Sequence, residues 1–215
     1  MTHCWVCGLK SKSLYPIVRK FYPLHAAECA SKFGGASRTH DHKEEVEKIN
    51  LTLPQGCKLL VKQLDSNMPD TKAAIRYLKS RGLNEDHFWY FKFCTSTEDR
   101  LRRRIVFPSF DSQGCLNYYV TRAIDPDVFL TYINTPVPKS TVIFNEINID
   151  WSQELTVTEG PFDLTKCNQN ATCLLGSTLT EDFFLFQQIV SHKTPILLAL
   201  DADMPEKTQY FARLL

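Results

Sequence analysis

Three acidic residues in the last third of the chain stand directly after short apolar runs. Glu159 follows the run 155–157, and Asp201 and Asp203 follow the run 196–200. If these runs are neighbouring parallel strands, the carboxylates converge, because such sheets place their sites at the carboxyl ends of the strands. Three close carboxylates repel one another unless a cation lies among them. The pattern therefore predicts a site for Mg²⁺ or Mn²⁺, the cations that all-oxygen ligands favour.

Spacing alone leaves a simpler explanation of these acids open. Loops after strands are polar, and Asp203 could cap a helix that begins near Pro205. If the cation site exists, Glu159, Asp201 and Asp203 are the candidate catalytic and metal-binding residues. Asp163 is a further candidate metal group through the motif, described below, to which Glu159 belongs.

The elements that must position these acids can be read from the alternation of short apolar runs with helix-length segments. We expect strand 155–157, helix 161–169, strand 173–175, helix 180–190, strand 196–200 and helix 205–215. This β-α-β-α-β order predicts a parallel sheet with right-handed crossovers. The last third of the chain is therefore expected to be α/β.

The middle of the chain has a different pattern. A helical periodicity over 69–80 ends at Arg81-Gly82, which supplies a basic last turn and a glycine stop. Two β-rich runs, 104–110 and 116–121, flank the turn sequence 111–114 and predict a hairpin. A further strand is expected at 142–144. These elements predict a mixed α+β part before the α/β part.

The acidic region resembles a known domain in three ordered pieces. They are Glu159-Gly160-Pro161-Phe162-Asp163, then Leu175-Gly176-Ser177, then Asp201-Ala202-Asp203. Together they resemble the TOPRIM domain of primases and topoisomerases. The upstream segments 77–83, 104–108, 111–114 and 119–123 look like the subdomain that precedes TOPRIM in DnaG-type primases, and the match is closest to those of bacteriophages.

The resemblance implies a DNA primase, a nucleotidyltransferase that makes short RNA primers during DNA replication. It implies single-stranded DNA as template, ribonucleoside triphosphates as substrates, Mg²⁺ or Mn²⁺ as cofactor and a replicative helicase as partner. Two alternatives stay open at this point. One is a TOPRIM nuclease that uses the same metal, and the other is a nucleic-acid-binding module without synthesis.

Four arginines at positions 100 and 102–104 crowd the entrance to the expected hairpin. Arginine suits phosphate because its guanidinium donates in a bidentate fork. By resemblance, Arg104 and Arg122 match arginines that face the TOPRIM groove. We therefore expect Arg103, Arg104 and Arg122 to bind nucleic acid or nucleotide. The alternative is a solvated strand end whose arginines pair with Glu98 and Asp99.

An aromatic run, Phe88-Trp89-Tyr90-Phe91-Lys92-Phe93, allows two interpretations. It could stack single-stranded bases, which bind aromatic rings with little sequence preference. Core packing is the preferred interpretation, because runs of large aromatic residues beside an apolar helix usually fill a core.

The first residues contain half of a zinc-binding motif. Cys4-Trp5-Val6-Cys7-Gly8 has the two-residue gap and trailing glycine of a zinc knuckle. His25 and Cys29 could complete the site. DnaG-type primases instead carry an N-terminal zinc ribbon whose second ligand pair looks like Cys4 and Cys7, and its first pair would precede Met1. By this resemblance we expect a partial zinc site in a fragment that begins inside the ribbon and ends inside TOPRIM.

The domain boundaries follow from these assignments. We expect a partial zinc ribbon at 1–33, a linker at 34–56, the primase N-terminal subdomain at 57–150 and an incomplete TOPRIM domain at 151–215. The 215 residues carry 25 Lys+Arg and 24 Asp+Glu, a formal net charge of +1, which excludes a bulk polyanion binder. The absence of a long apolar run and of a signal peptide predicts a cytoplasmic protein with reduced cysteines.

Overall fold

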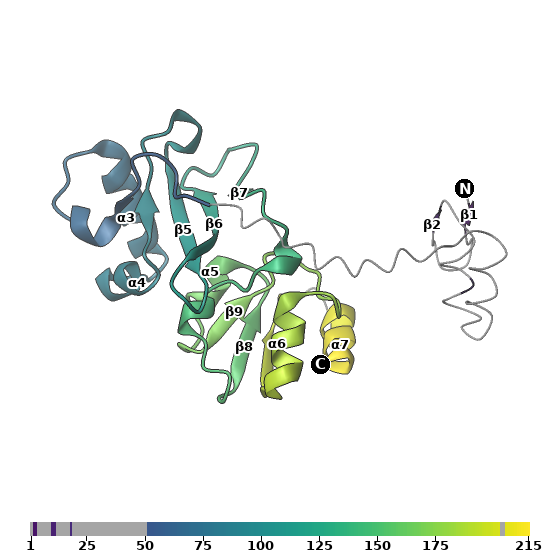
Figure 1. Ribbon diagram of the computed structural model, residues 1–215. Coiled ribbons are helices and arrows are strands. Elements are labelled where there is room, and N and C mark those ends of the chain that lie inside the picture. The colour runs from purple at the N-terminus through teal and green to yellow at the C-terminus, as the bar shows by residue number, and fades with distance from the viewer. Residues whose placement is uncertain (1, 4–9, 12–17, 19–50, 203–204) are drawn as a thin grey trace. The chain divides into compact units, whose positions relative to one another are not determined.

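The computed structural model describes residues 2–3, 10–11, 18, 51–202 and 205–215. The chain divides into two compact units, residues 1–49 and 50–215. In the first unit, β1 (Thr2–His3) and β2 (Lys10–Ser11) pair antiparallel (Figure 1). The expected zinc ligands Cys4, Cys7, His25 and Cys29 lie outside the described residues.

An antiparallel sheet forms the first half of the second unit, with strand order β3-β4-β5-β6-β7. Its strands are β3 (Lys58–Leu59), β4 (Cys94–Thr95), β5 (Arg104–Phe110), β6 (Leu116–Ala123) and β7 (Tyr132–Asn134). The expected hairpin is confirmed as β5–β6. Its turn forms because the Asp111 carboxylate accepts hydrogen bonds from the backbone N–H groups of Gln113 and Cys115, at 3.0 and 2.8 Å.

Two helices pack beside this sheet. The expected helix is confirmed as α3 (Pro69–Ser80), which starts with proline in its first turn and buries Ala74 and Leu78. It ends before Gly82, whose φ of +76° is a left-handed conformation that glycine adopts without strain. The second helix is α4 (Glu85–Tyr90), which Asn84 caps.

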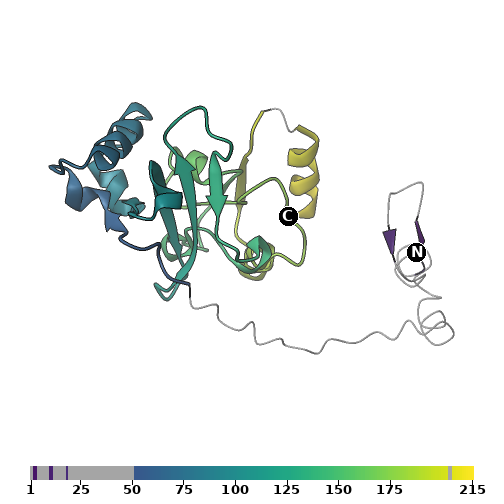
Figure 2. The ribbon, with the colours of Figure 1, turned by 90° about the horizontal axis from the view of Figure 1, so that it is seen from above.

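The parallel sheet has the strand order β10-β8-β9 and confirms the expected β-α-β-α-β pattern. The elements are β8 (Leu155–Thr158), α5 (Pro161–Leu164), β9 (Ala171–Cys173), α6 (Phe184–His192), β10 (Ile196–Ala199) and α7 (Pro205–Leu214). All four residues of β8 are buried, as befits the central strand. Figures 1 and 2 show α3 and α4 at one end of this unit and α7 at the other, with the sheets between them.

Some expected elements differ from those observed. The helix expected at 161–169 ends at Leu164, and the helix expected at 180–190 begins at Phe184. The strand expected at 142–144 is wrong. These residues join two short 3₁₀ helices, η4 (Lys139–Thr141) and η5 (Glu146–Asn148). Ile143 and Phe144 are buried in two different hydrophobic clusters, so their apolar character reflects packing and not strand pairing.

One aromatic core joins the two halves of the second unit. The Phe107 ring lies at its centre, 4.6 Å from the Phe93 ring and 6.0 Å from the Phe162 ring, between ring centroids. Phe88 and Phe93 are fully buried, so core packing is confirmed for much of the expected aromatic run. Trp89 of the same run is 54% exposed. This core crosses the expected boundary at residue 150, because Phe162 packs with the antiparallel sheet.

No described helix has the length and apolar composition that a membrane span requires.

Candidate active site

A pocket of about 340 Å³ lies at the carboxyl edge of the parallel sheet. Glu159 and Gly160 follow β8, Leu175 and Gly176 follow β9, and Asp201 follows β10; Pro161 and Asp163 belong to α5, and Val120, Tyr132 and Asn134 come from β6 and β7. The pocket therefore has one wall from each sheet. Its volume is within the range of small-molecule sites.

The sheet topology brings the acidic residues to this pocket. β8 and β10 are adjacent and parallel, with Thr158 beside Ala199, so the segments that carry Glu159 and Asp201 leave the sheet at neighbouring positions. The condition for convergence, that the first and third strands of the pattern are neighbours, is met. The Asp163 carboxylate lies close to the Gly160 backbone because Gly160 has no side chain. A Cβ on Gly160 would lie 3.0 Å from the Asp163 carboxylate. Asp203 lies outside the described residues.

The acids of the pocket fit a divalent cation in their donor chemistry. Glu159, Asp163 and Asp201 all line the pocket and offer only oxygen ligands. Among the described residues, no three His, Cys, Asp or Glu side chains are grouped closely enough to hold a metal ion by themselves. This arrangement suits Mg²⁺, which one or two carboxylates usually hold together with water and substrate phosphates.

Tyr132 of the opposite wall is bonded to Arg122, a cation that aromatic residues hold and that does not itself line the pocket. The Arg122 guanidinium donates through Nε to the Tyr77 hydroxyl at 2.5 Å and through Nη1 to the Tyr132 hydroxyl. Its Cζ lies 4.8 Å from the centroid of the Tyr132 ring and 5.2 Å from that of the Phe162 ring. Burial works to lower the pKa of Arg122, but its contacts with the two hydroxyls outweigh burial and raise that pKa.

Tyr132 links the two walls. Burial raises the pKa of its hydroxyl, and the nearby Asp163 carboxylate raises it further, whereas Arg122 opposes this. The Tyr132 hydroxyl therefore stays protonated near neutral pH while it accepts a hydrogen bond from Arg122. Tyr132 thus lies between the Arg122 cation and the acids of the pocket.

Two basic residues near the pocket were missed as site residues from sequence. The Arg81 guanidinium carbon lies 5.7 Å from the Phe162 ring centroid, so Phe162 contacts two guanidinium groups. Lys139 donates to the carbonyl of Leu175, which lines the pocket. Local sequence contains no signal for Lys139, because its contact crosses 36 positions of the chain.

Arg104 does not share a face with Arg122. In the β5–β6 ladder Arg104 is opposite Ala123, whereas Arg122 is opposite Ile105. Adjacent residues of a strand point to opposite faces, so the two arginines do not face one groove. The Arg104 guanidinium instead donates to the backbone carbonyls of Leu130 and Thr131, at 2.5 and 3.2 Å. A direct role for Arg104 in nucleic-acid binding stays a prediction.

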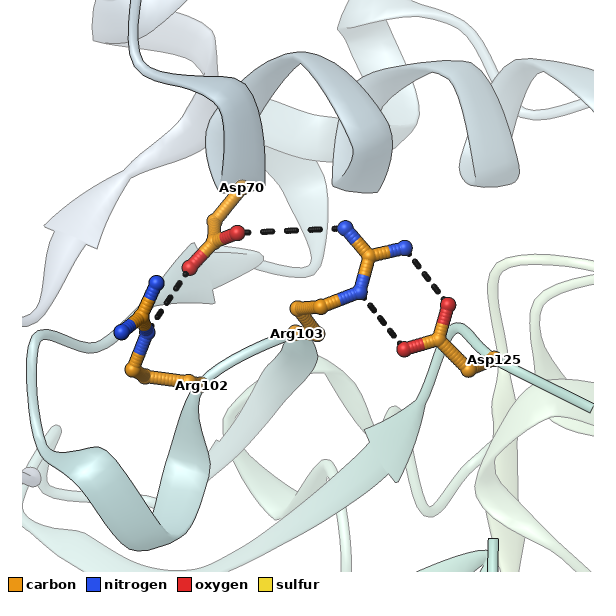
Figure 3. A network of polar contacts seen from close by, with 4 residues as sticks. All are labelled: Asp70, Arg102, Arg103 and Asp125. Carbon is orange, nitrogen blue, oxygen red and sulfur yellow. Dashed lines mark hydrogen bonds and ion pairs between the residues drawn. The ribbon is translucent and has the colours of Figure 1, made fainter. Parts of the chain in front are cut away.

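Arg103 is held by two carboxylates (Figure 3). It binds Asp125 in a bidentate pair, with N–O distances of 2.6 and 2.5 Å, and its Nη1 lies 3.8 Å from Asp70. Asp70 also accepts a hydrogen bond from Arg102 at 3.3 Å. Arg103 is thus engaged within the protein, by Asp125 and Asp70 and not by the Glu98 and Asp99 considered from sequence.

Comparisons with known proteins show what this chain is similar to. The chain matches no protein-family model. It is 24% identical over 252 residues to a protein named DNA primase from Campylobacter jejuni. That alignment covers 94% of this chain and 39% of the Campylobacter protein. It is also 24% identical over 243 residues to a DNA primase from Listeria innocua, covering 84% of this chain and 38% of that protein. The chain therefore spans about two fifths of the length of these relatives.

Solved structures give the same result for the fold. The catalytic core of DnaG superposes with a TM-score of 0.55 at 19% identity, covering 72% of this chain and 64% of that structure. The Aquifex aeolicus primase, with zinc-binding and RNA polymerase domains, has a TM-score of 0.55 at 19% identity and covers 99% of this chain and 63% of that structure. The chain has the mixed α/β fold of a DnaG-type primase core. The resemblance to DnaG-type primases is confirmed in sequence and in fold.

Proposed function

We propose that this chain contains the catalytic core of a DNA primase, which makes short RNA primers on single-stranded DNA. One observation carries the proposal: a single pocket joins the acids that follow the parallel strands to Tyr132 of the antiparallel sheet, whose hydroxyl accepts a hydrogen bond from Arg122. Nucleotidyl transfer needs both parts, because the metal requires carboxylates and the triphosphate requires cations. The similarity to proteins named DNA primase supports this choice.

In this proposal Glu159, Asp201 and Asp203 hold Mg²⁺, and Asp163 is an additional ligand. When bound, the metal lowers the pKa of the primer 3′ hydroxyl and neutralises charge on the transferred phosphate. The chain's own residues orient the substrate. Arg122 is fixed by Tyr77 and Tyr132, so its remaining N–H groups can donate to phosphate oxygens without first losing side-chain freedom.

The proposed function also includes single-stranded DNA as the template. A structure of a DnaG primase catalytic domain bound to single-stranded DNA has a TM-score of 0.50 with this chain and covers 65% of it. That structure supports single-stranded DNA as the ligand of this fold. A helicase partner, a bacteriophage source and zinc binding by Cys4 and Cys7 stay predictions from the resemblance.

One incubation separates this proposal from its alternatives. The full chain is mixed with single-stranded template, labelled ribonucleoside triphosphates and Mg²⁺, and the products are separated by size. A primase yields short labelled RNA that disappears when a chelator removes the metal. Shortened DNA without added triphosphates would instead show a nuclease, and binding without any product would show a non-catalytic module.

A further inference from the structure

Two cysteines of the second unit lie side by side at the edge of the antiparallel sheet. Cys57 stands directly before β3, and Cys94 is the first residue of β4. Leu59 of β3 is directly opposite Cys94, so Cys57, two positions before Leu59, lies diagonally across the same pair of strands. Both cysteines are free thiols, and the two thiol groups are in hydrogen-bond contact. The fold therefore brings the two sulfur atoms together without a covalent bond between them.

The backbone on both sides of Cys57 is bonded to the segment that contains β4. On one side, the Leu60 N–H donates to the carbonyl of Phe93 at 2.8 Å. On the other side, the Thr97 N–H donates to the carbonyl of Gln55 at 3.3 Å. Cys57 is therefore held against β4 between two fixed points, and a disulfide to this strand requires little movement of the backbone.

The two thiols differ in exposure and in acidity. Cys94 is 2% exposed, whereas Cys57 is half-buried and reaches solvent. The hydrogen bond with Cys94 lowers the pKa of Cys57, although burial and the charge of Glu98 oppose this. The same hydrogen bond and burial raise the pKa of Cys94. Cys57 is therefore the thiolate that meets an oxidant first, and Cys94 is the thiol that lies next to its oxidised form.

We propose that Cys57 and Cys94 are a redox pair, which a peroxide oxidises to a disulfide that fastens the start of the second unit to β4. The Cys57 thiolate attacks one oxygen of the peroxide, an S–O bond forms, the O–O bond breaks, and the released hydroxide takes up a proton and leaves as water. The Cys94 thiol then attacks the sulfenic sulfur of Cys57. The S–S bond forms, the S–O bond breaks, and the hydroxyl leaves as water with the proton of Cys94. Two electrons pass from the sulfur atoms to the peroxide.

The disulfide closes a loop that carries a contact of the candidate active site. Residues 57–94 contain η2 (Leu60–Gln63), α3 and α4, and the Tyr77 hydroxyl of α3 accepts a hydrogen bond from Arg122. A covalent link between the ends of this loop restricts the unfolded chain and so stabilises the folded one. Oxidation should therefore raise the melting temperature by roughly 5–10 °C.

Peptide mapping of the full chain after treatment with hydrogen peroxide tests the pair. The remaining thiols are alkylated, the chain is digested, and the peptides are identified by mass spectrometry. We expect the peptides that contain Cys57 and Cys94 to be joined by a disulfide, and dithiothreitol to release them. The mapping separates this disulfide from any that the cysteines of the first unit form. Cys115→Ser, which removes an exposed thiol elsewhere, is the matched control and should form the same disulfide in the same yield.

Two variants separate the roles of the two thiols. In Cys94→Ala, peroxide should carry Cys57 on to the sulfinic acid, because no neighbouring thiol intercepts the sulfenic acid. Alkylation of Cys57 in this variant should also shift to higher pH, since the hydrogen bond that favours its thiolate is lost. In Cys57→Ser, Cys94 should stay an unmodified thiol after the same treatment, and the rise in melting temperature on oxidation should disappear.

Cys57 that remains a free thiol, or that pairs with another cysteine, after peroxide has oxidised Cys115 would overturn the proposal. A disulfide between Cys57 and Cys94 that leaves the melting temperature unchanged would refute the fastening of the second unit. The inference does not rest on the proposed primase function, and none of these measurements needs catalysis. A chain that forms the disulfide but makes no RNA would refute the proposed function alone, and a primase without the disulfide would refute this inference alone.

Discussion

The charged residues at the two walls of the pocket differ in how firmly the protein holds them. On the parallel-sheet wall, Asp163 and Asp201 are exposed; Asp163 lies in the short helix α5 after β8, and Asp201 follows β10. On the antiparallel-sheet wall, Arg122 is half-buried and bound by two tyrosine hydroxyls and three aromatic rings. The acids remain able to rearrange around a cation, whereas the guanidinium is already oriented.

This difference predicts different consequences of mutation. Removing an exposed acid should abolish metal-dependent chemistry and leave stability unchanged, because few contacts are lost. Changing Arg122 should affect both activity and stability, since its contacts join α3, β6, β7 and α5. The predictions below test this contrast, beginning with the largest expected effect.

Asp201→Asn should lower primer synthesis by a hundredfold or more, because it removes at nearly constant volume the charge that binds the metal in the proposed function. The melting temperature should stay within 1 °C of the parent's, roughly the effect of a neutral surface substitution. Labelled triphosphate incorporation and thermal unfolding measure the two quantities. Glu181→Gln, an exposed acid before α6, is the matched control and should keep full synthesis. Parent-like synthesis by Asp201→Asn would refute the metal assignment.

Arg122→Lys should reduce kcat/KM for triphosphates about tenfold and lower the free energy of unfolding by about 1–2 kcal/mol. The positive charge is kept, but an ammonium group cannot reach both tyrosine hydroxyls while stacking on the Tyr132 and Phe162 rings. Steady-state kinetics and urea unfolding would measure the changes. A variant with normal stability and normal kinetics would show that the two walls do not differ as described.

Glu146→Gln tests what burial does to a carboxylate outside the pocket. Burial and the charge of Asp111 raise the pKa of Glu146 above its usual value. A raised folded-state pKa means that this group favours folding below its unfolded pKa of about 4.5 and that this contribution is lost as pH rises through the folded pKa. The variant should therefore melt a few degrees above the parent at pH 7, with a smaller advantage at pH 4. An unchanged difference across this pH range would contradict the assignment.

Arg103→Gln should have the smallest effect. Its guanidinium is exposed and already paired with Asp125, so we expect template affinity to change less than twofold and the salt slope to remain constant. The Arg103 contact also holds the pKa of Asp125 below its usual value. The pair's modest stabilisation is present above the unfolded pKa of Asp125 and is lost as pH falls through the lowered folded pKa. A tenfold loss of template affinity would restore Arg103 as a nucleic-acid ligand.

Local patterns were enough to predict several elements of the fold and the position of two acids after strands. The α3 helix follows from apolar spacing between a proline start and a glycine stop, and the β5–β6 hairpin follows from two β-rich runs around Asp111. The placement of Glu159 and Asp201 after strands is likewise predicted by short apolar runs that directly precede each residue. These signals extend over a few positions, because helix and strand periodicities and turn hydrogen bonds are themselves local.

The contacts of Arg122 and Arg103 were decided by the tertiary structure. Arg122 meets Tyr77 across 45 positions, and Arg103 meets Asp125 across 22 positions and not its sequence neighbours Glu98 and Asp99. Strand register sends Arg104 and Arg122 to opposite faces, which no count of basic residues reveals. Apolar character alone likewise misassigned residues 142–144, because burial in a core can satisfy such residues without a strand. Which side chains meet depends on how the two sheets pack, and this is a property of the folded chain as a whole.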